Sequence, residues 1–423
     1  MTKKADFVIV HASELATLKG NNEKPRSIER MSDLGVINDG AVAVKQGQII
    51  AVGPTERVLS ELQKGFETID ASGKLVTPGL IDSHVHLVFG GSREEELEQM
   101  AVKRTPYLEI KAKGGGMPTT LEKTAETSTE ELLERTAHIL DTMLIHGTTT
   151  IEAKSGYEMT QHGEIRQLEI IKKLDDTHPI DLVPTFMAQG IPFEYENRVD
   201  QLTHEIVEKW VPEVAKRKLA EYCDVFCEKG YFNVDQSRRI LEAGRRYGMK
   251  PRIHADWLAH SGGARLGADL GVVSADHLIF TRPDEIDALV RKDVMGTFLP
   301  TTPFCYLGTY AKARDIINAG LPIALASDLS AADMCESMQM MMTIAVLQMK
   351  MTTDEALVAS TINAAHAIER ADEIGSLEEG KKADIVVFDA LNHKFFAYHY
   401  GVNLAEKVFK NGKLVAENGR RIE

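Results

Sequence analysis

The chain has 423 residues, 43% of them hydrophobic and 26% charged, and its formal net charge is −14 at pH 7. This length and composition are typical of a soluble globular enzyme with one large domain or a few smaller ones. The acidic balance argues against nucleic acid or an anionic membrane as a partner, because both attract clustered lysine and arginine. A small anionic substrate is still compatible with it, since such a substrate needs only one or two local cations.

The sequence contains neither a membrane-span pattern nor a disulfide framework. No window approaches the roughly 18 continuous apolar residues that a spanning helix needs. The first ten residues fit a β-strand better than a signal peptide, because their apolar stretch is short. Four cysteines are too few to form a disulfide framework in so long a chain. We therefore expect the protein to reside in the reducing cytoplasm.

Both ends of the chain have the residue pattern of small β-sheets. Short β-branched runs separated by turn-rich loops occur at residues 6–11, 40–52, 67–76 and 383–389. Residues 407–415 enclose Asn411-Gly412, a dipeptide that strongly indicates a hairpin. We predict one small β-sandwich domain assembled from residues 1–75 and 376–423.

The middle of the chain alternates short apolar strands with amphipathic helices, such as those expected over residues 128–146 and 233–247. Strand-like runs occur at residues 148–152, 180–186, 223–228, 251–254, 273–277, 294–299 and 322–327. Together with a strand that begins near Val76 and leads to His84, they bring the number of strands to eight. Such alternation is the pattern of parallel βα units, and eight of them favour a closed TIM-like (β/α)8 barrel over an open sheet. The predicted fold is thus α/β, with the barrel spanning residues 76–375.

Histidines and a carboxylate stand where these strands end. His84 and His86 are two apart, so they point to one face of their strand and form a ready pair of metal ligands. His254, His277 and Asp328 each follow a later apolar run. Since the carboxyl ends of barrel strands meet at one mouth, where barrel chemistry takes place, we predict a metal centre there.

Seven motifs give the chain a specific resemblance to a known family. They lie at residues 76–82, 87–94, 114–116, 154–157, 254–263, 274–277 and 361–365, and read VTPGLID, LVFGGSRE, GGG, KSGY, HAD followed by Gly262-Gly263, SADH and TINAA. From about residue 75 to 380 the chain resembles the amidohydrolase superfamily and, within it, the imidazolonepropionases of histidine degradation. The resemblance implies hydrolysis of a C–N bond in a cyclic amide or amidine by metal-bound hydroxide.

The resemblance also implies one divalent metal ion and its ligands. The ligands would be His84, His86, His254 and Asp328, which suit zinc first, with iron or manganese as alternatives. Asp328 would also act as the catalytic base, and His277 would stabilise charge on the exocyclic atom. A second metal would need a bridging lysine after the fourth strand, where none is found; Lys154 lies one strand earlier.

Three further residues match the groups with which the family holds a substrate carboxylate. These are Arg93, Tyr107 and Tyr157. A guanidinium grips a carboxylate with two hydrogen bonds, and phenols can donate to the remaining lone pairs. The alternative for Arg93 is an ion pair within the acidic run 94–96. We expect a small cyclic substrate with a carboxylate arm, in this family a propionate.

The chain departs from the family pattern at the residues that would contact the ring. Trp257 stands where imidazolonepropionases have glutamate after His-Ala-Asp, and Ala188-Gln189-Gly190 lacks the family's histidine. Residues 329–333 and 300–302 differ as well. Gln189 and Trp257 are therefore predicted substrate contacts on an altered ring, such as a hydantoin or the thiohydantoin propionate expected from degradation of a thiolated histidine, ergothioneine. Tryptophan and methionine would tolerate a polarisable sulfur better than glutamate.

Other interpretations stay open at this point. One alternative is that ordinary imidazolone hydrolysis survives these replacements, and another is that the same metal site deaminates an amino-substituted ring. A non-enzymatic scaffold is disfavoured, because the ligand set is complete. The family suggests a homodimer, which the sequence does not test.

Overall fold

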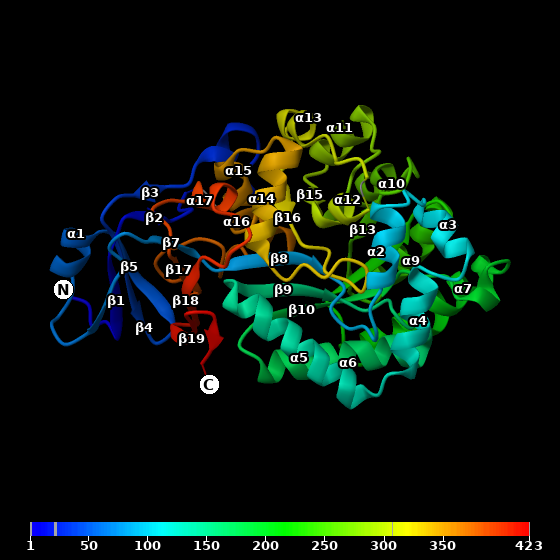
Figure 1. The fold of residues 1–423 in the computed structure, drawn as a ribbon, viewed down its shortest axis with the longest axis horizontal. Helices are drawn as coiled ribbons and strands as arrows, with labels where there is room; N and C mark the ends of the chain where they lie inside the picture. The colour runs from blue at the N-terminus through cyan, green and yellow to red at the C-terminus, as the bar shows by residue number, and fades with distance from the viewer. Residues whose placement is uncertain (1, 21–22, 307, 423) are drawn as a thin grey trace.

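The computed structural model describes residues 2–20, 23–306 and 308–422. It consists of two lobes, and both chain termini lie in the smaller one (Figure 1). The larger lobe is built on eight parallel strands whose neighbours follow chain order. They are β8 (Leu80–Val85), β9 (Thr148–Lys154), β10 (Asp181–Ala188), β11 (Tyr222–Cys227), β13 (Ile253–Ala255), β14 (Ser274–His277), β15 (Met295–Phe298) and β16 (Ile323–Leu325). The predicted (β/α)8 barrel is confirmed.

The barrel closes between its first and last strands through residues at the mouth. The backbone N–H of Asp328 donates to the carbonyl oxygen of His84 at 3.2 Å, and that of His86 donates to Leu329 at 2.9 Å. The backbone N–H of Ser327 donates to the buried carboxylate of Asp82 at 3.0 Å. Three residues of the predicted metal centre, His84, His86 and Asp328, thus take part in the seam.

Helices surround the strands and cover both ends of the barrel. The predicted helices at 128–146 and 233–247 are α5 (Thr129–Ile145) and α9 (Val234–Arg246). Each begins at a side-chain cap: Ser128 accepts from the N–H of Glu131, and Asn233 forms a reciprocal capping box with Gln236. The others on the barrel are α6 (Gln161–Thr177), α7 (Val199–Glu205), α8 (Val211–Lys216), α10 (Gly263–Leu270), α11 (Pro283–Arg291), α12 (Thr301–Cys305), α13 (Ala313–Asn318), α14 (Met338–Met349), α15 (Thr353–Ala359) and α16 (Ile362–Ala367).

Three helices between the first and second barrel strands lie at the end of the barrel remote from the small lobe (Figure 1). They are α2 (Glu94–Ala101), α3 (Tyr107–Ala112) and α4 (Met117–Glu126). The chain reaches α4 through Gly114 and Gly116, whose φ angles of 90° and 73° favour glycine. These helices bring residues of the βα loop over the mouth.

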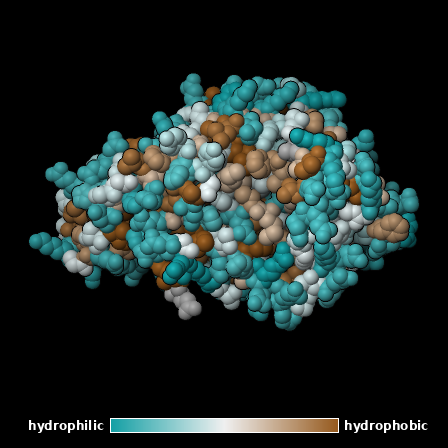
Figure 2. All heavy atoms as spheres, in the orientation of Figure 1, coloured by the Kyte–Doolittle hydropathy of each residue, from teal (hydrophilic) through white to brown (hydrophobic). Residues whose placement is uncertain are grey.

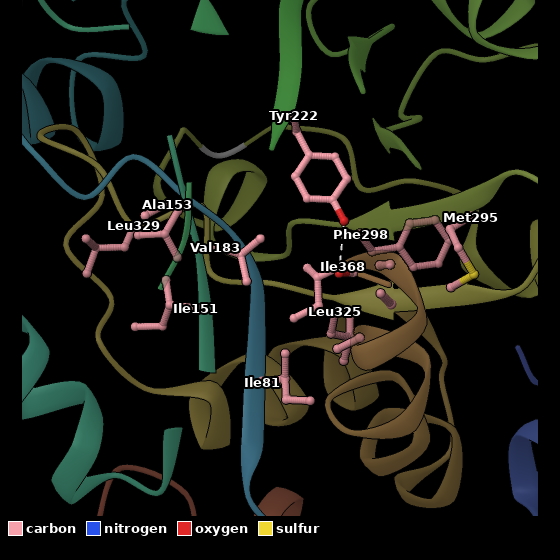
Figure 3. Close-up of a cluster of buried hydrophobic side chains, with 14 of the residues drawn as sticks. Ile81, Ile151, Ala153, Val183, Tyr222, Met295, Phe298, Leu325, Leu329 and Ile368 are labelled. Atoms are coloured by element: carbon pink, nitrogen blue, oxygen red, sulfur yellow. Dashed lines mark hydrogen bonds between the residues drawn. The ribbon is translucent and has the colours of Figure 1, made fainter. Parts of the chain in front are cut away.

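The barrel core is apolar and closely packed, as Figure 3 shows for side chains from several strands and the helix layer. Ile81, Ile151 and Val183 are buried on adjacent strands. Tyr222 is fully buried, and its hydroxyl donates to the carbonyl oxygen of Ile368 at 2.9 Å (Figure 3). A phenol buried this deeply needs such a partner, so this bond helps fix α16 on the barrel.

The small lobe contains two sheets drawn from both ends of the chain. One has the order β5-β4-β1-β6 and the other β20-β19-β18-β17-β7-β2-β3. Their strands are β1 (Phe7–Ala12), β2 (Glu14–Ala16), β3 (Val36–Ile37), β4 (Gly40–Lys45), β5 (Gln48–Pro54), β6 (Glu67–Asp70), β7 (Leu75–Pro78), β17 (Ile385–Phe388), β18 (Ala405–Lys410), β19 (Lys413–Glu417) and β20 (Arg420–Arg421). The predicted hairpin at Asn411-Gly412 joins β18 and β19, with both φ angles positive. Phe7 and Phe409 stack across the sheets at 5.2 Å.

Three sequence expectations about strands need correction. Residues 40–52 form two strands, β4 and β5, because Gln46 and Gly47 turn the chain with positive φ. Residues 67–76 likewise split into β6 and β7. The strand expected from Val76 to His84 is divided at Gly79: β7 pairs with β17 of the small lobe, whereas β8 enters the barrel. Gly79 is where the chain passes from one lobe to the other.

The surface and the cysteines agree with an acidic, thiol-containing protein. Hydrophilic residues dominate the face in Figure 2, and apolar side chains appear in separate patches. Cys223, Cys227, Cys305 and Cys335 are all free thiols. Within the described residues, no helix is both long and apolar enough to cross a membrane. The cytoplasmic location stays a prediction.

The point at Gly79 where the chain passes between the lobes leaves no room for a side chain, and this can be tested. A Cβ atom there would lie 2.2 Å from Thr149 Oγ1 and 2.6 Å from its Cγ2. We expect Gly79→Ala to lower the free energy of unfolding by about 1–3 kcal/mol through overpacking, as measured by urea denaturation. Gly308→Ala, whose Cβ would meet only Pro303 at 3.7 Å, is the control. Adding Thr149→Ala should recover part of the loss; no recovery would contradict the packing explanation.

Candidate metal centre and active site

The five predicted metal-centre residues meet at the mouth of the barrel. His84 lies within β8 and His86 directly follows it, while His254 lies in β13 and His277 ends β14. Asp328 follows β16. His277 and Asp328 have φ angles of 75° and 56°, so the chain turns sharply at both strand ends. All five side chains are buried.

The polar atoms of four of these residues lie at distances from one another that suit the ligands of one metal ion, and His84 belongs to two groups of three possible ligands, one with His86 and Asp328 and the other with His254 and His277. Asp328 Oδ1 lies 3.4 Å from His84 Nε2 and 3.3 Å from His86 Nε2, and His86 Nε2 lies 3.4 Å from His254 Nε2. Tetrahedral ligands bound at roughly 2.0–2.1 Å are about 3.3–3.4 Å apart. His84 Nε2 is buried and has no hydrogen-bond partner in the described part of the chain. These residues fit a divalent metal ion.

Carboxylates behind the histidines determine which ring nitrogen faces the predicted metal site. Asp276 Oδ2 lies 2.7 Å from His84 Nδ1, and Asp224 Oδ2 lies 3.1 Å from His254 Nδ1. A carboxylate that accepts from Nδ1–H leaves Nε2 unprotonated and available to a metal. Burial lowers the pKa of His86 to about 4, so this ring is neutral at pH 7.

A buried layer of charges lies beneath these carboxylates. Lys154 Nζ lies 2.8 Å from Asp224 and 2.9 Å from Glu152, and Arg252 reaches Asp276 at 3.5 Å. Burial opposes the charge on Lys154, but Asp224 and Glu152 outweigh it and raise the pKa of this lysine. Lys154 is therefore a charged partner of the layer, which disfavours the bridging role considered from the sequence.

One cavity joins the predicted metal site to the predicted substrate contacts. It is lined by His86, His254, His277 and Asp328. The same cavity is lined by all five predicted substrate residues, which are Arg93, Tyr107, Tyr157, Gln189 and Trp257. The structure thus brings together residues from six segments of the chain.

The environment of Arg93 combines both sequence interpretations. Its Nε and Nη2 donate to Glu96 Oε2 at 3.0 and 2.8 Å, so the ion pair considered as an alternative is present. Arg93 nevertheless lines the cavity. Glu96 Oε1 also accepts from the N–H of Gly116 at 2.7 Å, and so ties the arginine to the glycine loop. Glu96 orients Arg93 rather than removing it from the cavity.

Two side chains line the cavity where the chain departs from the family pattern. The indole of Trp257 stacks on the ring of His277, with 5.4 Å between centroids and an interplanar angle of 21°. Gln189 Oε1 is buried, has no hydrogen-bond partner among the residues that the structure describes, and lies over Gly156, where a Cβ would be 2.6 Å away. One part of the cavity lining is thus aromatic and another is an amide.

Sequence reasoning assigned no role to several residues that also line the cavity. They are Met117, Phe226, Thr302, Tyr306, Ser330, Ala332 and Asp333. Thr302 donates to Asp328 Oδ2 at 2.5 Å, and the hydroxyl of Tyr306 lies 3.5 Å from Arg93 Nη2. The differences from the family pattern at residues 300–302 and 329–333 could have pointed to Thr302, Ser330 and Asp333 as cavity residues. Nothing in the sequence pointed to Tyr306.

Comparisons with known proteins show the family of the chain. The amidohydrolase family model matches residues 75–415. The imidazolonepropionase of Geobacillus kaustophilus (strain HTA426) is 46% identical over 97% of both chains. That of Alkaliphilus metalliredigens (strain QYMF) is 45% identical over 99% of both.

Solved structures support the fold. A zinc-bound adenosine deaminase from Xanthomonas campestris has a TM-score of 0.71 at 19% identity, over 100% of this chain and 95% of the other. A triazine hydrolase from Arthrobacter aurescens has a TM-score of 0.72 at 17% identity, over 98% and 96%. Hydrolysis of C–N bonds in cyclic amides follows from the family match and the relatives. The chain belongs to the metal-dependent amidohydrolase family and is imidazolonepropionase-like.

Proposed function

We propose that this protein opens a five-membered imidazolone- or hydantoin-type ring that carries a propionate arm, with one divalent metal ion, zinc first. The observation that supports it is one cavity lined by three of the predicted metal ligands, His86, His254 and Asp328, and also by Arg93, Tyr107 and Tyr157. A ring placed at the cage, which is formed by His84, His86, His254 and Asp328, would extend its arm toward the arginine. The homodimer suggested by the family stays a prediction.

In this proposal His84, His86, His254 and Asp328 hold the metal. Neutral imidazoles and a carboxylate suit zinc, iron and manganese alike, and the spacing of about 3.3–3.4 Å suits a tetrahedral ion. When bound, such an ion lowers the pKa of water from about 15.7 to roughly 7 and polarises a carbonyl oxygen. The protein's own residues then determine where protons go and how the ring lies.

Asp328 is the proposed proton carrier. Thr302 holds its Oδ2 by a hydrogen bond, while Oδ1 faces the histidines. The carboxylate would take a proton from the attacking water and deliver it to the departing ring nitrogen. His277 is neutral, since burial lowers its pKa well below the usual range. Fixed by the stacked indole of Trp257, it would stabilise charge on the exocyclic atom.

The carboxylate arm would bind to Arg93, Tyr107 and Tyr157. Arg93 is buried and oriented by Glu96, so it is placed in advance for an anionic group. The hydroxyl of Tyr107 lies 3.3 Å from that of Tyr231 and accepts from the N–H of Met117 at 3.3 Å. These bonds fix the phenol against the cavity wall.

A 2-thioxo ring is a second candidate substrate, favoured by the stack of Trp257 on His277. An indole face next to the ring site suits a large, polarisable sulfur better than a polar heteroatom. Gln189 could donate to a remaining ring oxygen through its amide nitrogen. Deamination of an amino-substituted ring would use the same cage, and only the leaving group would differ.

The first test removes the metal. We expect chelation to abolish hydrolysis, and zinc, iron or manganese to restore it to different extents. His84→Ala should weaken metal binding by more than the 10–100-fold that loss of an outer partner costs. Metal content by mass spectrometry and hydrolysis by ring absorbance give the readouts. His11→Ala, at an exposed pair with Asp39, is the matched histidine control. Full metal content in His84→Ala would contradict the assignment.

The arm assignment is tested at Arg93. Arg93→Ala should raise KM and lower kcat/KM by about 30- to 1,000-fold for a ring with a propionate arm, which corresponds to 2–4 kcal/mol. Arg93→Lys should recover only part, since lysine lacks the planar fork. A ring without the arm is the control substrate, because its kcat/KM should change little. Equal losses for both substrates would indicate a structural role instead.

The ring assignment is tested by offering 4-imidazolone-5-propionate and its 2-thioxo analogue to the metal-loaded protein. If the aromatic wall selects sulfur, Trp257→Glu should shift the kcat/KM ratio toward the imidazolone by about tenfold or more, and Trp257→Phe should shift it little. Ring absorbance and released ammonia are followed together. Stoichiometric ammonia would identify a deaminase, and a large wild-type preference for imidazolone would exclude the altered ring.

A further inference from the structure

Asp333 is a buried carboxyl group in the wall of the active-site cavity. It lies in the loop after β16, five residues beyond Asp328, and only 4% of its surface is exposed. The cavity is lined by Asp333 together with Ser330 and Thr302. The proposed mechanism gives Asp333 no task.

The two oxygens of this carboxyl group differ in their partners. Oδ1 accepts the hydroxyl proton of Ser330. Oδ2 is buried and has no hydrogen-bond partner among the residues that the structure describes. The hydroxyl of Thr302 is nearby, but it has one proton, which it donates to Asp328 at 2.5 Å. Leaving a buried carboxyl oxygen without a partner costs about 1–3 kcal/mol or more, so a ligand group is the natural partner for Oδ2.

The neighbours of Asp333 indicate which part of a ligand it would meet. Asp333 lines the cavity together with Asp328 of the predicted metal site and Arg93 of the predicted arm site. Burial and the nearby Asp328 carboxylate raise the pKa of Asp333 well above its usual range, and Arg93 partly opposes them. A cation held by Asp328 and an N–H donor on Oδ2 would both favour the ionised form. A substrate that reaches both Asp328 and Arg93 places its ring between them.

The chemistry of the ring then selects the contact. Imidazolone and hydantoin rings present carbonyl oxygens and N–H groups. An ionised carboxylate repels the carbonyl oxygens, but it can accept a hydrogen bond from an N–H group. Ser330 reinforces this selection, because its donated proton keeps Oδ1 occupied and leaves Oδ2 as the acceptor.

We propose that Asp333 is a specificity-determining residue that accepts a hydrogen bond from a ring N–H of the substrate. This inference rests on the proposed function and names the ring feature that the site requires. A site built around such a buried acceptor rejects an analogue that lacks the donor, because the acceptor is then left unpaired. Rings with two N–H groups, such as cyclic ureides and thioureides, offer this donor in addition to the nitrogen that departs.

The experiment uses three probes on the full-length, metal-loaded protein. They are hydantoin-5-propionate and its N1-methyl and N3-methyl derivatives, with affinities measured by calorimetry and kcat/KM measured for any probe that is hydrolysed. One of the two methyl derivatives should bind wild type at least about 30-fold more weakly, because it lacks the N–H that Asp333 accepts.

Two variants and a control separate this role from a structural one. Asp333→Ala should reduce the preference for N–H over N-methyl to within about threefold. Asp333→Asn keeps the volume and should lose the preference too, since Ser330 holds the amide oxygen and turns the NH₂ group to the cavity. Glu336→Gln, a partly buried carboxyl three residues away, should keep it. Melting temperature and metal content report on folding.

The outcomes distinguish the two proposals. If wild type shows the preference and both Asp333 variants retain it, the inference is overturned while the proposed function stands. The inference is also overturned if wild type binds hydantoin-5-propionate and both methyl derivatives equally well. If wild type neither binds nor hydrolyses any probe, nor the imidazolone, the proposed function fails and the inference fails with it.

Discussion

The structure depends on how a layer of buried charge is compensated at the barrel mouth. Among the described residues, Lys154 and Arg252 form ion pairs with Glu152, Asp224 and Asp276, whereas Asp328 lies beside the histidines, and all six side chains are buried. With neutral histidines, these four carboxylates and two cations have a net charge near −2. Uncompensated charge in a protein interior is costly. A divalent cation held by the predicted ligands would offset this charge.

The same residues close the barrel. The seam between β8 and β16 consists of backbone bonds that involve His84, His86 and Asp328, together with the buried carboxylate of Asp82. Geometry at the cage is therefore fixed by the closure of the sheet. Strands and their hydrogen bonds place the histidines, whereas loops place most of the residues that face the ring.

This division explains what the sequence could predict. The barrel, the two-ended small lobe and the convergence of His84, His254 and Asp328 follow from strand periodicity and from the common direction of parallel strands. Strand periodicity is local information, and the common direction of parallel strands is topological information, so neither needs the details of side-chain packing. The break at Gly79 could not be read from residue pattern, because it depends on the distant Thr149 side chain.

Loop residues were harder to predict for the same physical reason. Tyr306 and Asp333 reach the cavity through irregular backbone that has no period, so their position depends on tertiary packing. The pairing of Arg93 with Glu96 also needed the structure, since sequence spacing allowed any of three glutamates. The assignment of individual ligands and substrate contacts stays a prediction for experiment to decide.

The cavity thus separates reactivity from selectivity. Its reactive side is polar, held by strands and supported by the charge layer, and any substitution there would disturb both folding and metal binding. The residues proposed to select the ring are Trp257, Gln189 and Asp333, and all three are carried by loops. Loops tolerate replacement because few backbone bonds depend on them. A chain can therefore keep the cage and the arm site of the imidazolonepropionases while it changes the ring that it accepts.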